Sequence, residues 1–280
     1  MNQIKTFKTY FFLFFLIFSL KIFALPISFG VNQGNLKYKE LSTPNFRIYH
    51  DERASNEAQM TAQTLESYKK ILETWIGVKR EKKVPIISSA VTSGASFANL
   101  ITDAIELQTL GQGHRDLFLH EYTHTLMYEH YHNWFGPAGS LIHIAWMPVW
   151  FLEGLAEAIT VSIGSDVQAG IERYHALSGN WPSYDRIHSI YVRNRSLMGY
   201  ATSGAFVSWL LSKKKGETLH FILEDFFNYS LLALLTIPSA LTFYRPWTFL
   251  PHDASLKNYY EKDGEALYKE YQKEVTAYWK

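Results

Sequence analysis

The feature that most restricts the fold is the run His120-Glu121-Tyr122-Thr123-His124, which lies in a stretch with helical apolar spacing, residues 115–131. On a helix, side chains four positions apart lie on one face, about one turn from each other. Both histidines of this H-E-x-x-H pattern can therefore reach a single metal ion. Glu121 stands next to the first histidine, where it can take a proton from a water molecule that the ion has acidified.

The composition narrows the chemistry of such a site. The chain has no cysteine, so histidine, aspartate and glutamate are the available zinc ligands. Its 280 residues, 47% of them hydrophobic and 19% charged, suffice for one large domain or two small ones with a buried core. The formal net charge of +1 gives no basic stripe of the kind that holds a phosphate backbone, so we expect no nucleic acid partner.

A catalytic zinc site needs a third protein ligand and an open position for water. Residues 149–161 have helical spacing and carry Glu153 near the start of the helix, with Glu157 one turn later on the same face. Glu153 is therefore our candidate for the third ligand. Glu157 is placed to accept the free N–H of a ligand histidine, which would fix the tautomer of that histidine. The alternative for both residues is a solvated acidic helix start that the helix dipole favours.

His130 is the rival third ligand, because its spacing from the two motif histidines matches the metzincin pattern H-E-x-x-H-x-x-G-x-x-H. That pattern needs a glycine where the helix stops and the chain turns the third ligand inward. Met127 occupies the glycine position here. We therefore expect His130 and His132 to lie at the end of the helix, where histidines interact favourably with its dipole.

Strands are expected in the first part of the chain and helices in the second. Alternating or β-branched runs predict strands, and a period of 3.6 residues predicts helices. The predicted strands are residues 45–50, 82–88 and 104–109, and the predicted helices are residues 54–75, 115–131, 149–161, 200–213 and 264–279. This order argues for an α+β fold rather than a doubly wound parallel sheet.

The N-terminal stretch has the composition of an export signal. Lys5 and Lys8 precede an apolar run at residues 10–20 that is too short to cross a bilayer comfortably, and the small Ala24 follows. We expect residues 1–24 to be a cleavable signal peptide and residues 25–280 to be one catalytic domain, exported to the periplasm or secreted. An uncleaved N-terminal anchor is the alternative.

The motif at residues 120–124, followed by Trp150-Phe151-Leu152-Glu153-Gly154-Leu155-Ala156-Glu157, resembles the peptidase MA-like branch of the gluzincins, which is related to aminopeptidases and thermolysin. The likeness continues more loosely through residues 96–99, 199–210 and 264–271, so that it covers most of residues 42–280. It implies a zincin-like metallopeptidase fold, in which a small N-terminal sheet with an edge strand precedes a mainly helical part.

The resemblance also implies a role for each residue of the two motifs. It implies that His120, His124 and Glu153 bind Zn²⁺. It implies further that Glu121 is the general base and that Glu157 supports a ligand histidine from behind.

Related enzymes often place a tyrosine or histidine to stabilise the developing oxyanion, and Tyr200 is the candidate for this role. The alternative is a tyrosine packed in the core with its hydroxyl bonded elsewhere. An extended substrate would add to the edge strand around residues 105–109. The apolar segment at residues 132–148, which includes His143, would line a pocket, touch a membrane surface or fill the core.

The expected activity is that of a zinc metallopeptidase, which hydrolyses a peptide bond in a peptide or protein substrate. One alternative is a non-catalytic exported protein that keeps the zinc fold as a binding or assembly module. Glu121 separates the two, because a purely structural zinc site does not require a base. Another alternative is a protease module whose specificity comes from an unidentified protein partner.

Overall fold

The N-terminal strands form one mixed sheet of five strands. In the computed structural model their order is β1-β2-β3-β5-β4, with β2, β3 and β5 parallel and the two outer strands antiparallel to their neighbours. The strands are β1 (Lys39–Ser42), β2 (Phe46–His50), β3 (Val84–Ser89), β4 (Phe97–Asn99) and β5 (Ala104–Gln108). The structure describes residues 37–89, 96–100, 102–108, 115–132, 140, 147–162, 166–188, 197–213 and 251–280.

Some sequence predictions lie outside these ranges. The expected signal peptide at residues 1–24 is one, and most of the segment at residues 132–148, with His143, is another. Among the described residues, no helix combines the length and the hydropathy that a membrane span requires.

The parallel strands bury one face against helices. Phe46 and Ile48 on β2 are fully buried, whereas Arg47 between them is exposed. Ile48 lies opposite Ile86 of β3, which lies opposite Ile105 of β5, so a continuous apolar row crosses the sheet. The helices pack against this apolar row.

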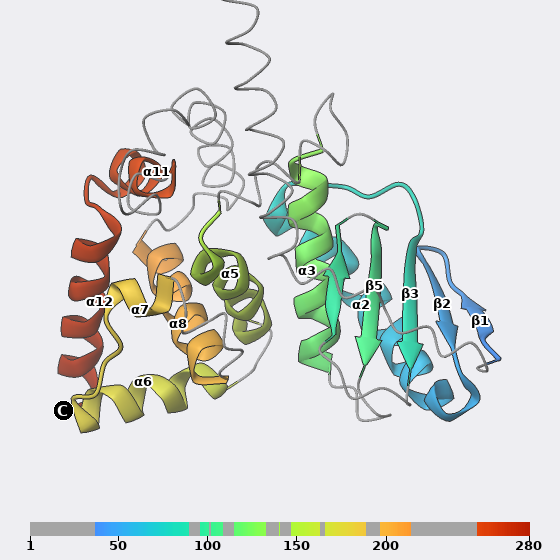
Figure 1. The fold of residues 1–280 in the computed structure, drawn as a ribbon, viewed down its shortest axis with the longest axis horizontal. Helices are drawn as coiled ribbons and strands as arrows, with labels where there is room; N and C mark the ends of the chain where they lie inside the picture. Colours follow the sequence, from blue (N-terminus) through green and yellow to red (C-terminus); the bar gives the residue numbers. More distant parts are fainter. Residues whose placement is uncertain are drawn as a thin grey trace, which may run out of the picture. The chain divides into compact units, whose positions relative to one another are not determined.

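The helical elements match the sequence predictions closely and add several short ones. The described elements are η1 (Glu52–Ala54), α2 (Ser55–Ile76), α3 (Arg115–His130), α5 (Val149–Ser162), α6 (Val167–Ser178), α7 (Tyr184–His188), α8 (Leu197–Lys213), α11 (Pro251–Tyr260) and α12 (Gly264–Trp279). The α+β fold class is confirmed, because a small mixed sheet precedes a mostly helical part (Figure 1). Because β1 and β4 are antiparallel to their neighbours, the sheet is mixed rather than wholly parallel.

The position of the edge strand corrects one prediction. We expected the edge around residues 105–109, but β5 lies inside the sheet between β3 and β4. Ala98 of β4 lies opposite Ile105, so the three-residue strand β4 covers this side of β5 and forms the edge itself. Strand propensity identifies β5 as a strand but carries no information on its neighbours, and β4 is too short to be recognised by alternation.

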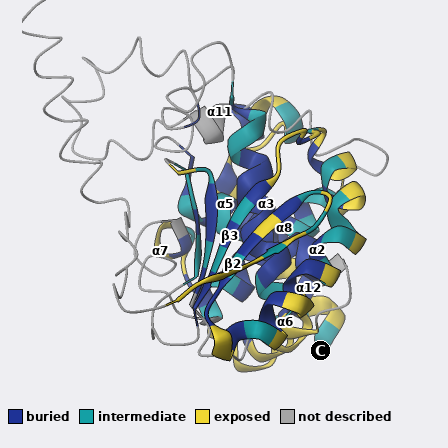
Figure 2. Ribbon diagram, turned by 90° about the vertical axis from the view of Figure 1, so that its right-hand side faces the viewer, coloured by how far each residue is buried: buried dark blue, intermediate teal, exposed yellow. Residues whose placement is uncertain are grey.

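Helix α3 lies at the centre of the fold. It packs on α2, β4 and β5 on one side and on α5 on the other (Figure 1). Every residue from 118 to 127 is buried, and Figure 2 shows buried residues concentrated along α3, α5 and the strands, with exposed residues on α6 and α12. A helix covered on all sides is held in a fixed orientation, which matters because α3 carries the H-E-x-x-H pattern.

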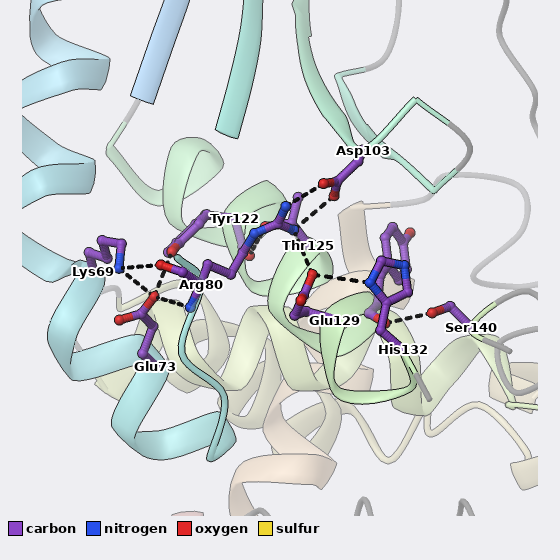
Figure 3. A network of polar contacts seen from close by, with 10 residues as sticks. Lys69, Glu73, Arg80, Asp103, Tyr122, Thr125, Glu129, His132 and Ser140 are labelled. Atoms are coloured by element: carbon purple, nitrogen blue, oxygen red, sulfur yellow. Dashed lines mark hydrogen bonds and ion pairs between the residues drawn. The ribbon is translucent and has the colours of Figure 1, made fainter. Parts of the chain in front are cut away.

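A buried arginine fixes the back of α3 (Figure 3). The side chain of Arg80 is almost fully buried and makes a two-bond contact with Asp103, in which Nη1 lies 2.8 Å from Oδ1. The same Nη1 lies 3.5 Å from the carboxylate of Glu129 on α3. The turn between β4 and β5, where Asp103 has a positive φ of 53°, is thereby joined to the C-terminal half of α3.

The network continues from Arg80 to α2. Glu73 accepts hydrogen bonds from the backbone N–H of Arg80 at 2.8 Å and from Nζ of Lys69 at 2.5 Å (Figure 3). The hydroxyl of Tyr122, on the back of α3, donates to the same carboxylate at 3.5 Å. The two short bonds to this carboxylate are charge-assisted and about twice as strong as neutral ones, whereas the Tyr122 bond is long and weak. The network therefore ties α2, α3 and the β4–β5 turn together.

Replacing Arg80 tests this arrangement. Arg80→Met keeps most of the aliphatic volume but removes the bonds to Asp103 and Glu129, and we expect the free energy of unfolding to fall by about 2–3 kcal/mol. The neighbouring Lys79→Met removes an exposed ion pair with Glu81 and should leave stability essentially unchanged. Urea unfolding of both variants measures the difference. Equal stability of the two variants would show that the Arg80 network does not hold α3.

Candidate metal centre

Three ligand-type atoms from two helices converge on one point. The Nε2 atoms of His120 and His124 lie 3.1 Å apart, and each lies 3.2 Å from Oε2 of Glu153. Both histidines are buried, with 8% and 4% of their surface exposed. Within the described part of the chain, this is the group of histidine and acidic side chains whose atoms are close enough to share one ion.

The spacing of the three atoms fits a metal ion. Ligands about 2.0–2.1 Å from a tetrahedral ion lie about 3.3 Å from one another, close to the separations observed here. Hydrogen bonding alone explains the arrangement poorly. If both Nε2 atoms carried protons, two N–H groups would oppose each other at 3.1 Å in a buried place. Two imidazoles and one carboxylate are a donor set that suits zinc and leaves a fourth position open.

Glu157 stands behind the first histidine. Its Oε1 lies 3.0 Å from Nδ1 of His120, and a carboxylate can only accept, so Nδ1 carries the proton. In the neutral imidazole, Nε2 then has the free lone pair that a metal needs. Nδ1 of His124 is buried and has no hydrogen-bond partner among the described residues, so the second histidine lacks such support.

The sequence of α5 explains how both carboxylates reach the site. Glu153 and Glu157 are four residues apart and share one face of the helix, which begins beyond Pro148. Gly154 allows α8 to approach from the other side, because a Cβ atom there would lie 2.7 Å from the backbone oxygen of Ser203. A Cβ on Gly204 of α8 would lie 2.5 Å from Cβ of Glu157. The two helices thus pack in backbone contact beside the acidic pair.

Glu121 follows His120 on α3, but its carboxylate is not one of the three ligand-type atoms that converge. The side chain is buried, and the backbone N–H of Ala98 on β4 donates a hydrogen bond to its carboxylate. Burial raises the pKa of Glu121, although His120, His124 and the Ala98 N–H oppose the change. A carboxylate with a raised pKa is better matched to proton transfer near neutral pH.

The pKa values of the other site residues shift in opposite directions. Burial alone would raise the pKa of Glu153, but His124 and His120 lower it far below its ordinary value. Burial alone would lower the pKa of His120, but the carboxylates of Glu153 and Glu157 raise it well above that value. Glu153 and the protonated form of His120 therefore stabilise each other's charge, so the site favours positive charge beside Glu153.

Two tyrosines flank the histidines. Tyr200, which we expected just before a helix, lies in the first turn of α8, and its ring centroid is 6.2 Å from that of His120. Tyr128 on α3 lies at the other histidine, with its ring almost parallel to that of His124 and the centroids 6.2 Å apart. Burial, Glu153 and Glu121 together raise the pKa of Tyr128, so its hydroxyl stays protonated and can donate.

His130 does not join the ligand atoms. It lies in the last turn of α3, and its ring packs edge-on against Tyr131 with centroids 5.0 Å apart. His132 follows the helix, where its Nδ1 lies 3.2 Å from the carboxylate of Glu129. Both histidines thus lie at the helix end, and the structure does not bring His130 into the metal-ligand group.

Two participants were absent from the sequence prediction. Tyr128 follows His124 by four residues, so the helical period that pairs the histidines also brings it to their face. That signal was available in the sequence. The Ala98 N–H was not foreseeable in the same way, because its contact with Glu121 depends on where β4 pairs.

No protein-family model matches the chain, and no curated protein matches it significantly. Its function is therefore inferred from the geometry of this site.

Metal analysis of two histidine variants tests the ligand group. We expect about one zinc per chain in the wild-type protein. His124→Ala should lose this zinc, because two ligands hold the ion far less tightly than three. His130→Ala, the matched control at the end of the same helix, should retain it. Elemental analysis after extensive dialysis gives the result, and loss of zinc from His130→Ala alone would instead support the metzincin-like ligand set.

Proposed function

We propose that the chain is a zinc-dependent metallopeptidase of the gluzincin type, with a zincin-like fold. The observation that carries the proposal is the convergence of the buried His120 and His124 with the half-buried Glu153, together with a further buried carboxylate, Glu121, next to His120 in the chain. A structural metal site is complete with its ligands and gains nothing from an additional buried carboxylate. A hydrolytic site requires one as a base.

Zinc bound by these three residues would supply a Lewis acid that lowers the pKa of water and polarises a carbonyl group. Glu121 takes one proton from the attacking water as its oxygen bonds to the carbonyl carbon. The same carboxyl group then passes that proton to the amide nitrogen as the C–N bond breaks, which gives an amine and a carboxylic acid. The acid keeps the second proton of the water and then loses it to the amine or to solvent. The raised pKa of Glu121 suits both of its transfers.

The other residues orient the site and contact the substrate. Glu157 keeps the proton of His120 on Nδ1, which directs the Nε2 lone pair to the metal position. Tyr200 is a candidate donor to the carbonyl oxygen as it becomes negative, because its ring lies beside His120.

An extended peptide is the substrate form that the fold accommodates best. Strand β4 is the edge of the sheet, and its Ala98 N–H already contacts the base, so a peptide added to β4 would pass directly beside Glu121. Main-chain hydrogen bonds to a strand edge bind an extended peptide with little dependence on its side chains. The proposed binding strand is therefore β4, in place of the residues around β5 that the sequence suggested.

A comparison of two carboxylate variants tests the proposal. Glu121→Gln keeps the volume and removes only the base, so zinc should stay bound while peptide hydrolysis falls by at least about a hundredfold. Glu153→Gln replaces a charged ligand by a weak neutral one, so zinc affinity should fall first. Added zinc should restore part of the activity of Glu153→Gln and none of that of Glu121→Gln. Hydrolysis of a peptide library across a zinc titration gives the comparison.

Two results would contradict the proposal. One is recovery of Glu121→Gln at high zinc concentration, which would show that this residue binds metal rather than moving protons. The other is full zinc occupancy with undiminished activity in Glu153→Gln, which would remove Glu153 from the ligand set. Absence of peptide hydrolysis in the zinc-loaded wild-type protein would exclude the peptidase function itself.

A further inference from the structure

The outer edge of β4 is already occupied by two side chains of α3. Ala98 is the central residue of β4, and its N–H donates to Glu121 while its carbonyl oxygen lies 3.4 Å from the hydroxyl of Tyr128. Both backbone groups therefore point away from Ile105, the residue opposite Ala98 on β5. A peptide that adds to this edge must pair with these same two groups.

The two contacts differ in strength. A carboxylate that accepts from a backbone N–H makes a charge-assisted bond. The Tyr128 bond at 3.4 Å is much longer than the usual 2.7–2.8 Å of an O–H···O bond, so little free energy is lost when it breaks. A substrate N–H can therefore replace the Tyr128 hydroxyl at the Ala98 carbonyl at low cost.

The position of Tyr128 keeps its hydroxyl at the site after such an exchange. Its ring lies nearly parallel to the ring of His124, and its backbone carbonyl accepts a 2.6 Å hydrogen bond from the buried Ser140. The hydroxyl is close enough to Glu121 and Glu153 to interact with both carboxylates. A hydroxyl near the base and a metal ligand can donate to the carbonyl oxygen of a peptide that reacts there.

We propose that Tyr128 is a catalytic residue. When an extended peptide pairs with β4, the Tyr128 hydroxyl leaves the Ala98 carbonyl and donates instead to the scissile carbonyl oxygen of the peptide. The proposal rests on the peptidase function proposed above. In the free protein the hydroxyl covers the β4 edge, and in the complex it donates to the oxygen as negative charge develops there. Tyr128 and Tyr200 would then approach the reacting group from opposite histidines, His124 and His120.

The test compares Tyr128→Phe with Tyr122→Phe. Both remove one hydroxyl from α3 and keep the ring, but Tyr122 faces Glu73 on the back of the helix. We expect Tyr128→Phe to lower kcat for a peptide substrate by about tenfold or more, with zinc content and Tm unchanged. Tyr122→Phe should keep the wild-type kcat.

Binding of a peptide phosphonate gives a second measurement. Its tetrahedral phosphorus imitates the geometry of the carbonyl carbon after water has added, so a lost transition-state contact weakens its binding. Tyr128→Phe should weaken the phosphonate by about the same factor as kcat/KM. An unchanged phosphonate affinity and unchanged kcat would overturn the proposal, as would a loss of kcat that only follows a loss of zinc or of Tm.

The same experiment separates this proposal from the one on which it rests. If the zinc-loaded wild-type protein neither cleaves peptides nor binds the phosphonate, the proposed peptidase function is wrong. The proposed role of Tyr128 is then wrong as well. If the wild type does both and Tyr128→Phe behaves as Tyr122→Phe, the peptidase stands and Tyr128 only joins α3 to β4.

Discussion

The central constraint on this fold is the approach of two imidazole nitrogens and one carboxylate oxygen to within 3.1–3.2 Å of one another between helices α3 and α5. Buried polar atoms at such distances need hydrogen bonds or an ion to compensate for lost water. Because His120 and His124 are four residues apart, helix α3 places both of them on one face. Glu153 must come from a different helix, so the site depends on how closely and in what orientation α5 meets α3.

That orientation is set from both sides of the pocket. Behind α3, the buried Arg80 joins the helix to the β4–β5 turn. Behind α5, Gly154 lets the backbone of α8 come into direct contact, and this brings the first turn of α8 to the histidines. The placement of the site residues therefore depends on polar contacts behind α3 and on the absence of a side chain at Gly154 of α5. Both are features that a list of ligands would omit.

Sequence reasoning succeeds here where a property is local. The periodicity of residues 115–131 and 149–161 locates α3 and α5, and the i, i+4 rule puts Glu157 near a ligand once Glu153 is close. Sequence reasoning fails where a property depends on which strands pair with each other. Nothing in the strand-like run at residues 104–109 shows that a three-residue strand, β4, covers its edge. Tyr128 could have been found by extending the helical period one more turn past His124.

The central claim concerns the identity of the atoms that surround the metal. Zinc K-edge X-ray absorption spectroscopy of the purified, dialysed protein measures these atoms without reference to activity. We predict about one zinc per chain whose scattering requires two imidazoles and additional oxygen atoms at about 2.0–2.1 Å. In Glu153→Ala, part of the oxygen scattering or the zinc itself should be lost, whereas in Glu81→Ala, which removes an exposed carboxylate, the spectrum should not change. A spectrum that requires three imidazoles, or zinc that is removed by dialysis from the wild type, would contradict the site described here.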